Sequence, residues 1–306
     1  MLRHTDRFRP ATTYATNTVV TRTIGIGLII FSAAGFGTLA IFGRYAYAAG
    51  MDALTILFLR FSLAALALVF LLLLRREPLP RGWTLMQLVG MGALGYVGQA
   101  FSYLTALNYA SSGLVALLLY LYPVFVTILA VVVFRERVTR LKVVALLLAL
   151  VGTGLTIGPA GGQALGIILA ISAAIIYSVY IMVGVGVMKQ VSAVQSSTVI
   201  FAAAGAMAGL LMWTRGAHWP ATTAGWSAIG AIVVVATVLP VVAFLAGLYR
   251  IGPTNAAMLS TLEPVVTVLL AAWLQAEILQ PITMLGGGLI LGAVLILTQS
   301  ELRRRE

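Results

Sequence analysis

Glu263 is the only acidic residue deep inside an apolar stretch of the sequence. An ionisable group at such a depth is costly unless it faces a cavity or a partner, so Glu263 is a candidate for function. Ser260 and Thr267 share its helical face at spacings of three and four. Two roles fit this pattern: contact with a substrate or proton, and a hydrogen bond that clamps a neighbouring helix. We expect the clamp as the main role and keep Ser260 and Glu263 as substrate-binding candidates.

An opposite charge, Arg60, lies inside the apolar stretch 52–74. A long arginine side chain in such a helix reaches toward an interface, or it pairs with a carboxylate or a helix end. It is also able to grip the carboxylate of a substrate. We expect Arg60 to be a structural anchor.

Several tyrosines lie near the middle of apolar stretches. Tyr96, Gln99 and Tyr103 share one helical face. Lipid-facing helices place tyrosine at the membrane interfaces, so tyrosines at mid-span indicate an internal, wet surface. Aromatic faces with a few polar groups suit an amphipathic metabolite. The predicted substrate-binding residues are Tyr96, Gln99, Tyr103, Tyr120, Tyr122, Tyr177, Tyr180, Ser260 and Glu263.

The residues that enzymes and metal sites need are missing from the apolar core. The chain has no cysteine, and His4, His218, Asp6 and Asp52 all lie outside the core. No zinc-binding histidine motif occurs, and no glycine-rich stretch is followed by the Lys-Ser/Thr pair of an ATP site. We therefore expect no enzyme activity, no catalytic residues, no metal and no cofactor.

These residues must be positioned by membrane helices. The chain has 306 residues, of which 61% are apolar and 9% charged, whereas a soluble domain carries about 25% charged residues. Each membrane crossing needs about 20 apolar residues. The sequence predicts an all-α integral membrane protein with ten spans, at about 24–43, 52–74, 83–106, 111–134, 141–158, 163–185, 192–213, 225–249, 252–275 and 282–299.

Basic residues predict the orientation of these spans. Outside the spans, every Lys and Arg except Arg44 and Arg215 falls on the side of the N-terminus. Positive charge marks the cytoplasmic side, so both termini are expected in the cytoplasm of a cell-membrane protein. The net charge of +11 is spread between apolar stretches, which argues against a nucleic-acid partner. A cleaved signal peptide over 1–49 is an alternative, but its apolar run is too long.

The two halves of the sequence are similar. A shift of 141 residues places 111–136 on 252–277 and Pro123 on Pro264, and a shift of 140 places Phe61 on Phe201. Five spans per half, an odd number, predict two inverted repeats with a site at their junction, the architecture of a secondary transporter. The predicted domains are an N-terminal cytoplasmic tail at 1–23, five-helix repeats at 24–158 and 159–299, and a basic tail at 300–306.

Pro123 and Pro264 lie at the centres of the fourth and ninth spans. Proline has no N–H, so each frees the carbonyl four residues earlier, at Leu119 and Ser260. Free polar backbone at mid-membrane recurs at transport sites. A packing kink, a binding role and a hinge all fit, and we name both prolines as hinges.

Three stretches resemble motifs of the drug/metabolite transporter superfamily, EamA type. They are Phe58-Leu59-Arg60-Phe61, the run from Ala106-Leu107-Asn108-Tyr109-Ala110 through Tyr122-Pro123 to Phe134-Arg135-Glu136-Arg137-Val138-Thr139, and Leu262-Glu263-Pro264-Val265 through Trp273 to Glu277. Ala276 and Ile278 depart from the residues that often flank the second glutamate.

Within that superfamily the chain looks most like the YddG-type amino-acid exporters. The resemblance implies export of small amphipathic metabolites, amino acids including aromatic ones, by alternating access at a mid-membrane cavity. A channel-like facilitator and an exporter of drugs or other metabolites are the alternatives. The expected partners are a small-molecule substrate and the lipid bilayer, and the sequence leaves proton coupling open.

Overall fold

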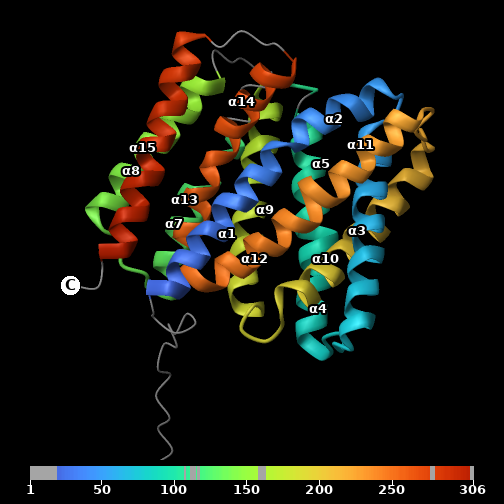
Figure 1. The fold of residues 1–306 in the computed structure, drawn as a ribbon, viewed down its shortest axis with the longest axis horizontal. Helices are drawn as coiled ribbons and strands as arrows, with labels where there is room; N and C mark the ends of the chain where they lie inside the picture. The colour runs from blue at the N-terminus through green and yellow to red at the C-terminus, as the bar shows by residue number, and fades with distance from the viewer. Residues whose placement is uncertain are drawn as a thin grey trace, which may run out of the picture.

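A computed structural model describes residues 19–106, 108–110, 115, 118–157, 163–275 and 280–303 (Figure 1). All its regular elements in these ranges are helical. The first half contains α1 (Val19–Gly37), α2 (Leu39–Ala48), α3 (Ala53–Arg75), α4 (Gly82–Gly90), the π-helical segment η1 (Met91–Tyr96), α5 (Val97–Ala106), α7 (Tyr122–Phe134) and α8 (Arg140–Ile157). The second half contains α9 (Ala164–Val187), α10 (Ala193–Arg215), α11 (Thr223–Val233), the π-helical segment η2 (Val234–Val238), α12 (Leu239–Ile251), α13 (Pro253–Leu259), the three-ten turn η3 (Ser260–Leu262), α14 (Glu263–Gln275) and α15 (Pro281–Arg303).

Local sequence signals explain where several helices begin and end. The Asp52 side chain caps α3 by accepting a hydrogen bond from the Thr55 backbone N–H at 3.0 Å. Ser192 and Gln195 form a reciprocal capping box at the start of α10. Gly252, with φ of 81°, ends α12, and Pro253 then starts α13. These signals set the turns that send the chain back through the bundle.

The all-helical class predicted from the sequence is confirmed. Seven helices in the described ranges are long and apolar enough to cross a membrane, namely Val20–Ala48, Ala53–Arg75, Ala164–Val187, Ala193–Arg215, Thr223–Ile251, Pro253–Leu274 and Pro281–Gln299. A shorter apolar helix covers Tyr122–Phe134. Helices also occupy the predicted third and fifth spans, as α4 to α5 and as α8. A total of ten membrane spans stays a prediction.

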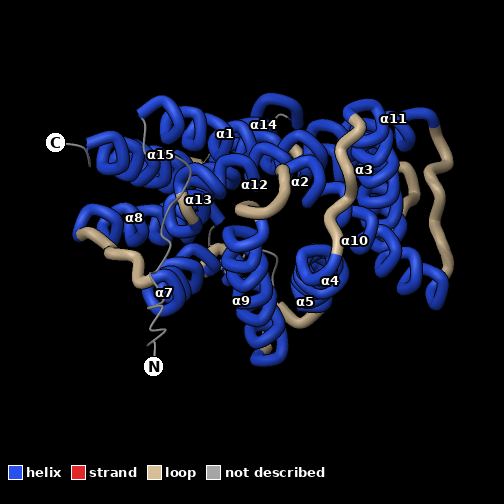
Figure 2. Tube along the Cα trace, turned by 90° about the horizontal axis from the view of Figure 1, so that it is seen from below, coloured by secondary structure: helices blue, strands red, loops and turns tan. Residues whose placement is uncertain are grey.

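Helices of the two halves pack mainly on each other. The largest contacts join α8 to α15, α3 to α10, α1 to α12 and α5 to α9, followed by α10 to η1, α2 to α11 and α7 to α9. Figures 1 and 2 show α8 and α15 together at one edge of the molecule and α3, α10 and α11 at the opposite edge. The cross-half pairs keep the same pattern when every helix is replaced by its counterpart in the other half. A two-fold axis between the halves produces such a pattern.

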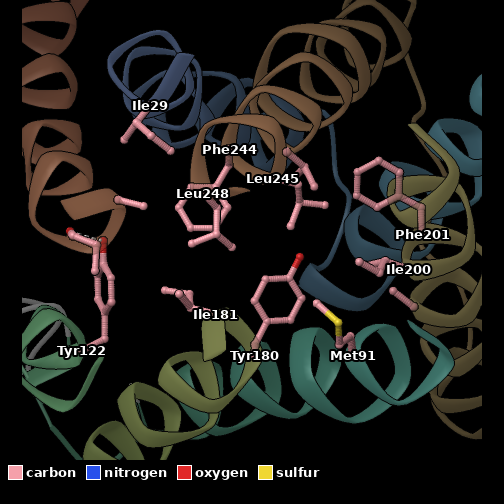
Figure 3. Packing of buried hydrophobic residues seen from close by; sticks show 14 of the residues in the cluster. Ile29, Met91, Tyr122, Tyr180, Ile181, Ile200, Phe201, Phe244, Leu245 and Leu248 are labelled. Carbon is pink, nitrogen blue, oxygen red and sulfur yellow. Dashed lines mark hydrogen bonds between the residues drawn. The ribbon is translucent and has the colours of Figure 1, made fainter. Parts of the chain in front are cut away.

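The core of the bundle brings side chains from both halves together. Phe61 of α3 and Phe201 of α10 are fully buried, and their rings stack with centroids 6.0 Å apart. These two residues are equivalent under the 140-residue shift. Figure 3 shows Phe201 and Ile200 meeting core residues of α9, α12 and η1. If a two-fold axis related the two halves, residues equivalent in the halves would meet each other only near that axis, as Phe61 and Phe201 do.

Apart from Arg60, the basic residues of the described chain lie at the ends of the bundle, most of them at one end. The start of α1 and the end of α15 lie at the same end (Figure 1), which we call the basic end. Its basic residues are Arg22, Arg75, Arg76, Arg81, Arg135, Arg137, Arg140, Lys142, Lys189, Arg250 and Arg303, whereas the far end carries Arg44 and Arg215. Trp213, Trp219 and Trp226 are exposed near the far end.

Candidate substrate-binding site

Two helices are interrupted at the predicted prolines. Helix α7 begins at Tyr122, directly before Pro123, and α14 begins at Glu263, directly before Pro264. Proline is tolerated in a first helical turn because the N–H there has no helical partner. The Ser260 carbonyl, which the sequence interpretation left unpaired, instead accepts a hydrogen bond from the Glu263 backbone N–H. That detail of the prediction was wrong because the three-ten turn η3 tightens the backbone before α14.

A continuous row of aromatic rings crosses the interior. We call Tyr120, Tyr122, Tyr177, Tyr180 and Tyr96 the tyrosine chain. Successive ring centroids lie 6.3, 4.9, 5.9 and 5.7 Å apart in that order. Edge and stacked geometries of this kind are favourable between aromatic rings. The structure therefore brings five of the predicted site residues, from α7, α9, η1 and the residues before α7, into one surface.

Hydrogen bonds hold the middle of the tyrosine chain. The Tyr122 hydroxyl, in a side chain 3% exposed, donates to the Ala257 carbonyl of α13 at 3.2 Å. Ser178 of α9 donates to the Tyr122 carbonyl at 3.2 Å and to the Ala174 carbonyl at 2.7 Å. Tyr122 is thus fixed between two helices of the second half, right at the break before Pro123.

Tyr180 is buried without a partner for its hydroxyl. Its side chain is 4% exposed, and its oxygen has no hydrogen bond with any described residue. Figure 3 shows the hydroxyl directed toward Leu245 and Leu248 of α12. An unpaired buried hydroxyl destabilises a folded protein. This hydroxyl stays a predicted contact for a polar atom of a ligand.

The Glu263 carboxylate is half-buried and makes no hydrogen bond or ion pair with the described residues. The clamp expected of this glutamate is made by its neighbour instead. Thr267 donates to the Gly37 carbonyl of α1 and to the Glu263 carbonyl, both at 3.1 Å. In the described residues the helix clamp is thus the Thr267 hydroxyl, one turn later, and the role of the Glu263 carboxylate stays a prediction.

The remaining predicted residues lie around the tyrosine chain. Ser260 is buried and donates to the Ala256 carbonyl at 2.9 Å, so its hydroxyl is used within its own helix. Gln99 of α5 is half-buried and has no hydrogen-bond partner among the described residues. Tyr103 packs on a smaller cluster that contains Ala106 and Ala170, and its ring makes no contact with the rings of the chain. Sequence spacing placed Tyr96 and Tyr103 on one helical face. In the structure they have different neighbours, because Tyr96 contacts Tyr180 and Tyr103 packs on the smaller cluster.

Arg60 is anchored, as expected, but to a partner that sequence reasoning missed. Its Nε donates to Thr237 Oγ1 at 2.6 Å and its Nη2 donates to the Ala236 carbonyl at 3.2 Å, both in η2. Its guanidinium also lies over the ring of Tyr96, 5.9 Å from the centroid. The sequence carries no signal for this contact, because Thr237 lies 177 residues from Arg60.

The glutamate of the first-half motif forms a buried ion pair near the basic end. Lys142 Nζ lies 3.1 Å from Glu136 Oε1, and Thr254 donates to Glu136 Oε2 at 3.0 Å. Lys142 is 1% exposed. The three residues join the end of α7, the start of α8 and the start of α13, and their pairing was not predicted. Glu277, the counterpart in the second half, lies outside the described residues.

Two other features are separate from this site. An apolar groove between α14 and α15, lined by Val265, Val268, Leu269, Thr283, Met284, Gly287, Gly288 and Leu291, faces outward. Within the described ranges, no three His, Asp or Glu side chains gather in a way that could hold a metal ion. The interior polar groups near the tyrosine chain are therefore the candidates for binding.

Several known proteins are similar to this chain in sequence or in fold. An uncharacterized transporter of Archaeoglobus fulgidus is 30% identical over 274 residues, covering 89% of this chain and 95% of that protein. The uncharacterized transporter YcbK of Bacillus subtilis is 26% identical over 285 residues, covering 88% and 90%. One solved crystal structure, at 22% identity, matches with a TM-score of 0.78 over 91% of this chain and 98% of its own.

The family itself is shown by a repeated match. The sequence profile of the EamA-like transporter family matches residues 23–158 and matches again at residues 164–299. The protein therefore carries two EamA repeats, which together span most of the chain and include every residue of the tyrosine chain. This multi-pass membrane protein belongs to the EamA-like transporter family of the drug/metabolite transporter superfamily.

Proposed function

We propose that this transporter exports small amphipathic metabolites, amino acids with aromatic side chains among them, by alternating access at the tyrosine chain. The observation that carries the proposal is the position of this chain, between the helix break at Tyr122 and the π-helical segment at Tyr96. Aromatic faces bind apolar bodies, and a few polar groups orient them. The unpaired groups of Tyr180, Gln99 and Glu263 supply that polarity.

The two repeats are proposed to be inverted and to exchange conformations during transport. The cross-half pairing of helices supports this arrangement, because it is unchanged when the halves are interchanged. Pro123 and Pro264 are proposed as the hinges, since both stand where a helix is interrupted. The concentration of basic residues at one end supports a cytoplasmic location for that end and for both termini.

Transport into liposomes tests the proposal. Purified protein is reconstituted, and uptake of labelled tryptophan, phenylalanine and alanine is measured with and without unlabelled tryptophan inside. A carrier shows saturable uptake that internal substrate accelerates, with tryptophan preferred to alanine. Glu263→Gln should change the affinity for tryptophan, whereas Tyr45→Phe, an exposed tyrosine outside the chain, should not.

Two results would oppose the proposal. Ion-like conductance, with flux that rises linearly with tryptophan concentration, would indicate a channel. Saturable transport of other amphipathic compounds, with no amino acid accepted, would keep the carrier and remove the amino-acid assignment. Repeating the measurement with an imposed pH gradient determines whether protons drive the flux.

A further inference from the structure

We propose that Arg60 is a positioning residue for transport, which fastens the π-helical segment η2 of the second half to the ring of Tyr96 in η1 of the first half. Its consequence for transport rests on the function proposed above. The contact itself is independent of any substrate. Arg60 would act through the site wall rather than by touching the transported molecule.

The contacts of Arg60 are with a threonine hydroxyl, a backbone carbonyl and two aromatic rings. The side chain is 5% exposed, and it forms no ion pair with a carboxylate in the described part of the chain. Two of its N–H groups are bound by Thr237 Oγ1 and the Ala236 carbonyl. The guanidinium carbon lies 5.1 Å from the Phe61 ring centroid and 5.9 Å from that of Tyr96. A buried cation is stabilised by such carbonyl, hydroxyl and ring contacts.

The segment η2 needs partners of this kind. A π-helical segment interrupts the normal ladder of backbone hydrogen bonds, and such segments are rare and frequent at functional sites. Thr237 donates through Oγ1 to the Ile232 carbonyl, five residues earlier, at 2.7 Å. The same oxygen accepts a hydrogen bond from Arg60 Nε. The carbonyl of the preceding residue, Ala236, accepts one from Arg60 Nη2. Arg60 therefore stabilises the irregular winding directly.

The other half holds its π-helical segment in a different way. The 141-residue shift places η1 on residues 232–237, overlapping η2, and the 140-residue shift places Arg60 on Ile200. At that place Gly92 of η1 packs so closely on α10 that an added Cβ would collide with the Ile200 carbonyl oxygen. The segment η1 is held by backbone contact with α10. The segment η2 is held by Arg60 and by close packing on Gly35 of α1, where an added Cβ would lie 2.9 Å from the Val235 carbonyl oxygen. A substitution at Arg60 should therefore loosen η2 and leave η1 packed on α10.

Tyr96 connects this anchor to the site. Its ring lies 5.7 Å from that of Tyr180, the next member of the tyrosine chain. Loss of the guanidinium removes the cation from one face of Tyr96 and the donors from η2. The wall of the site then becomes mobile at η2, beside Tyr96, and a substrate that packs on the tyrosine chain must order it again. Weaker substrate binding is the expected result.

Hydrogen exchange of backbone amides tests the anchor without a substrate. Arg60→Met and Thr237→Val should each raise exchange in peptides covering 234–238 by about tenfold, because each removes a hydrogen bond of a charged donor. Thr237→Ser keeps the hydroxyl and should exchange like the wild type. Arg60→Lys should give an intermediate value. Arg44→Met, an exposed arginine at the far end, is the matched control.

Tryptophan transport in liposomes is the second readout. Arg60→Met and Thr237→Val should raise KM about tenfold, with the maximal rate per folded molecule within about twofold of the wild type. Unchanged exchange at 234–238 in Arg60→Met would overturn the anchor. Faster exchange with an unchanged KM would reduce Arg60 to a folding role and overturn positioning. Failure of the wild type to transport tryptophan would contradict the proposed substrate, while the exchange result still decides the anchor.

Discussion

Tyr122 and Tyr180 both belong to the tyrosine chain, on either side of Tyr177, yet only one of their hydroxyls is hydrogen-bonded. The Tyr122 hydroxyl has a carbonyl partner, and the Tyr180 hydroxyl has none in the described chain. Removing a satisfied buried hydroxyl leaves its acceptor unpaired, whereas removing an unsatisfied one relieves a penalty. The same substitution at these two rings should therefore separate a structural hydroxyl from a binding one.

We expect Tyr122→Phe to lower the free energy of unfolding by about 1 kcal/mol and Tyr180→Phe to leave it unchanged or raise it. Tyr180→Phe should instead raise KM for substrates that carry a hydrogen-bonding group, by about tenfold. Thermal unfolding in detergent and liposome uptake measure the two effects. A clear loss of stability in Tyr180→Phe would show that its hydroxyl is already satisfied and would remove it from the site.

At the scale of elements, close packing of the π-helical segment η1 can be tested with one methyl group. Gly92→Ala should force η1 away from α10, since its Cβ would meet the Ile200 carbonyl and the Ala203 side chain. Overpacking of this kind costs about 1–3 kcal/mol. Gly98→Ala, in α5, has open space and should be neutral or stabilising by up to about 1 kcal/mol. Thermal unfolding of both variants makes the comparison, and equal stabilities would contradict the packing.

The helices and the irregular segments differ in how far sequence reveals them. Apolar runs predicted most helices to within a few residues, as for 52–74 against Ala53–Arg75, because burial in lipid or protein follows composition. The breaks at Pro123 and Pro264 were also predictable, since proline changes the backbone locally. The π-helical segments were not, because their contacts come from distant parts of the sequence: Arg60 lies 177 residues from Thr237 of η2, and Gly92 of η1 packs on Ile200.

Some features of the candidate site were likewise predictable from the sequence and others were not. Depth within a span placed the tyrosines correctly near one another, and five of them make ring contacts. Tyr103 was grouped with Tyr96 by helical spacing, but its surroundings depend on how α5 packs on α9. The partners of Glu136 were hidden for a similar reason. Lys142 is near in sequence, whereas Thr254 comes from the other half of the chain.

For the whole molecule, the absence of cysteine makes orientation simple to measure. Single cysteines at Leu79, in the turn between α3 and α4, and at Ala221, before α11, lie at opposite ends of the bundle and are exposed. In intact cells, a membrane-impermeant maleimide should label Ala221→Cys at once. It should label Leu79→Cys only after permeabilisation. The reverse pattern would invert the proposed orientation, and labelling of both from outside would contradict a bundle that spans the membrane.

Glu136 and Lys142 make the two halves chemically unequal. The residue at the place of Lys142 in the second half is Thr283, which carries no charge. If the two halves exchange conformations during transport, the half with the ion pair and the half with Thr283 adopt each conformation in turn. The inward-facing and outward-facing forms then differ in free energy. A difference of about 1.4 kcal/mol already gives a tenfold ratio of populations. Without substrate, most molecules then adopt the form of lower free energy. A substrate makes the two forms equally populated only if its affinity for the rarer form is higher by the same factor as the ratio of populations.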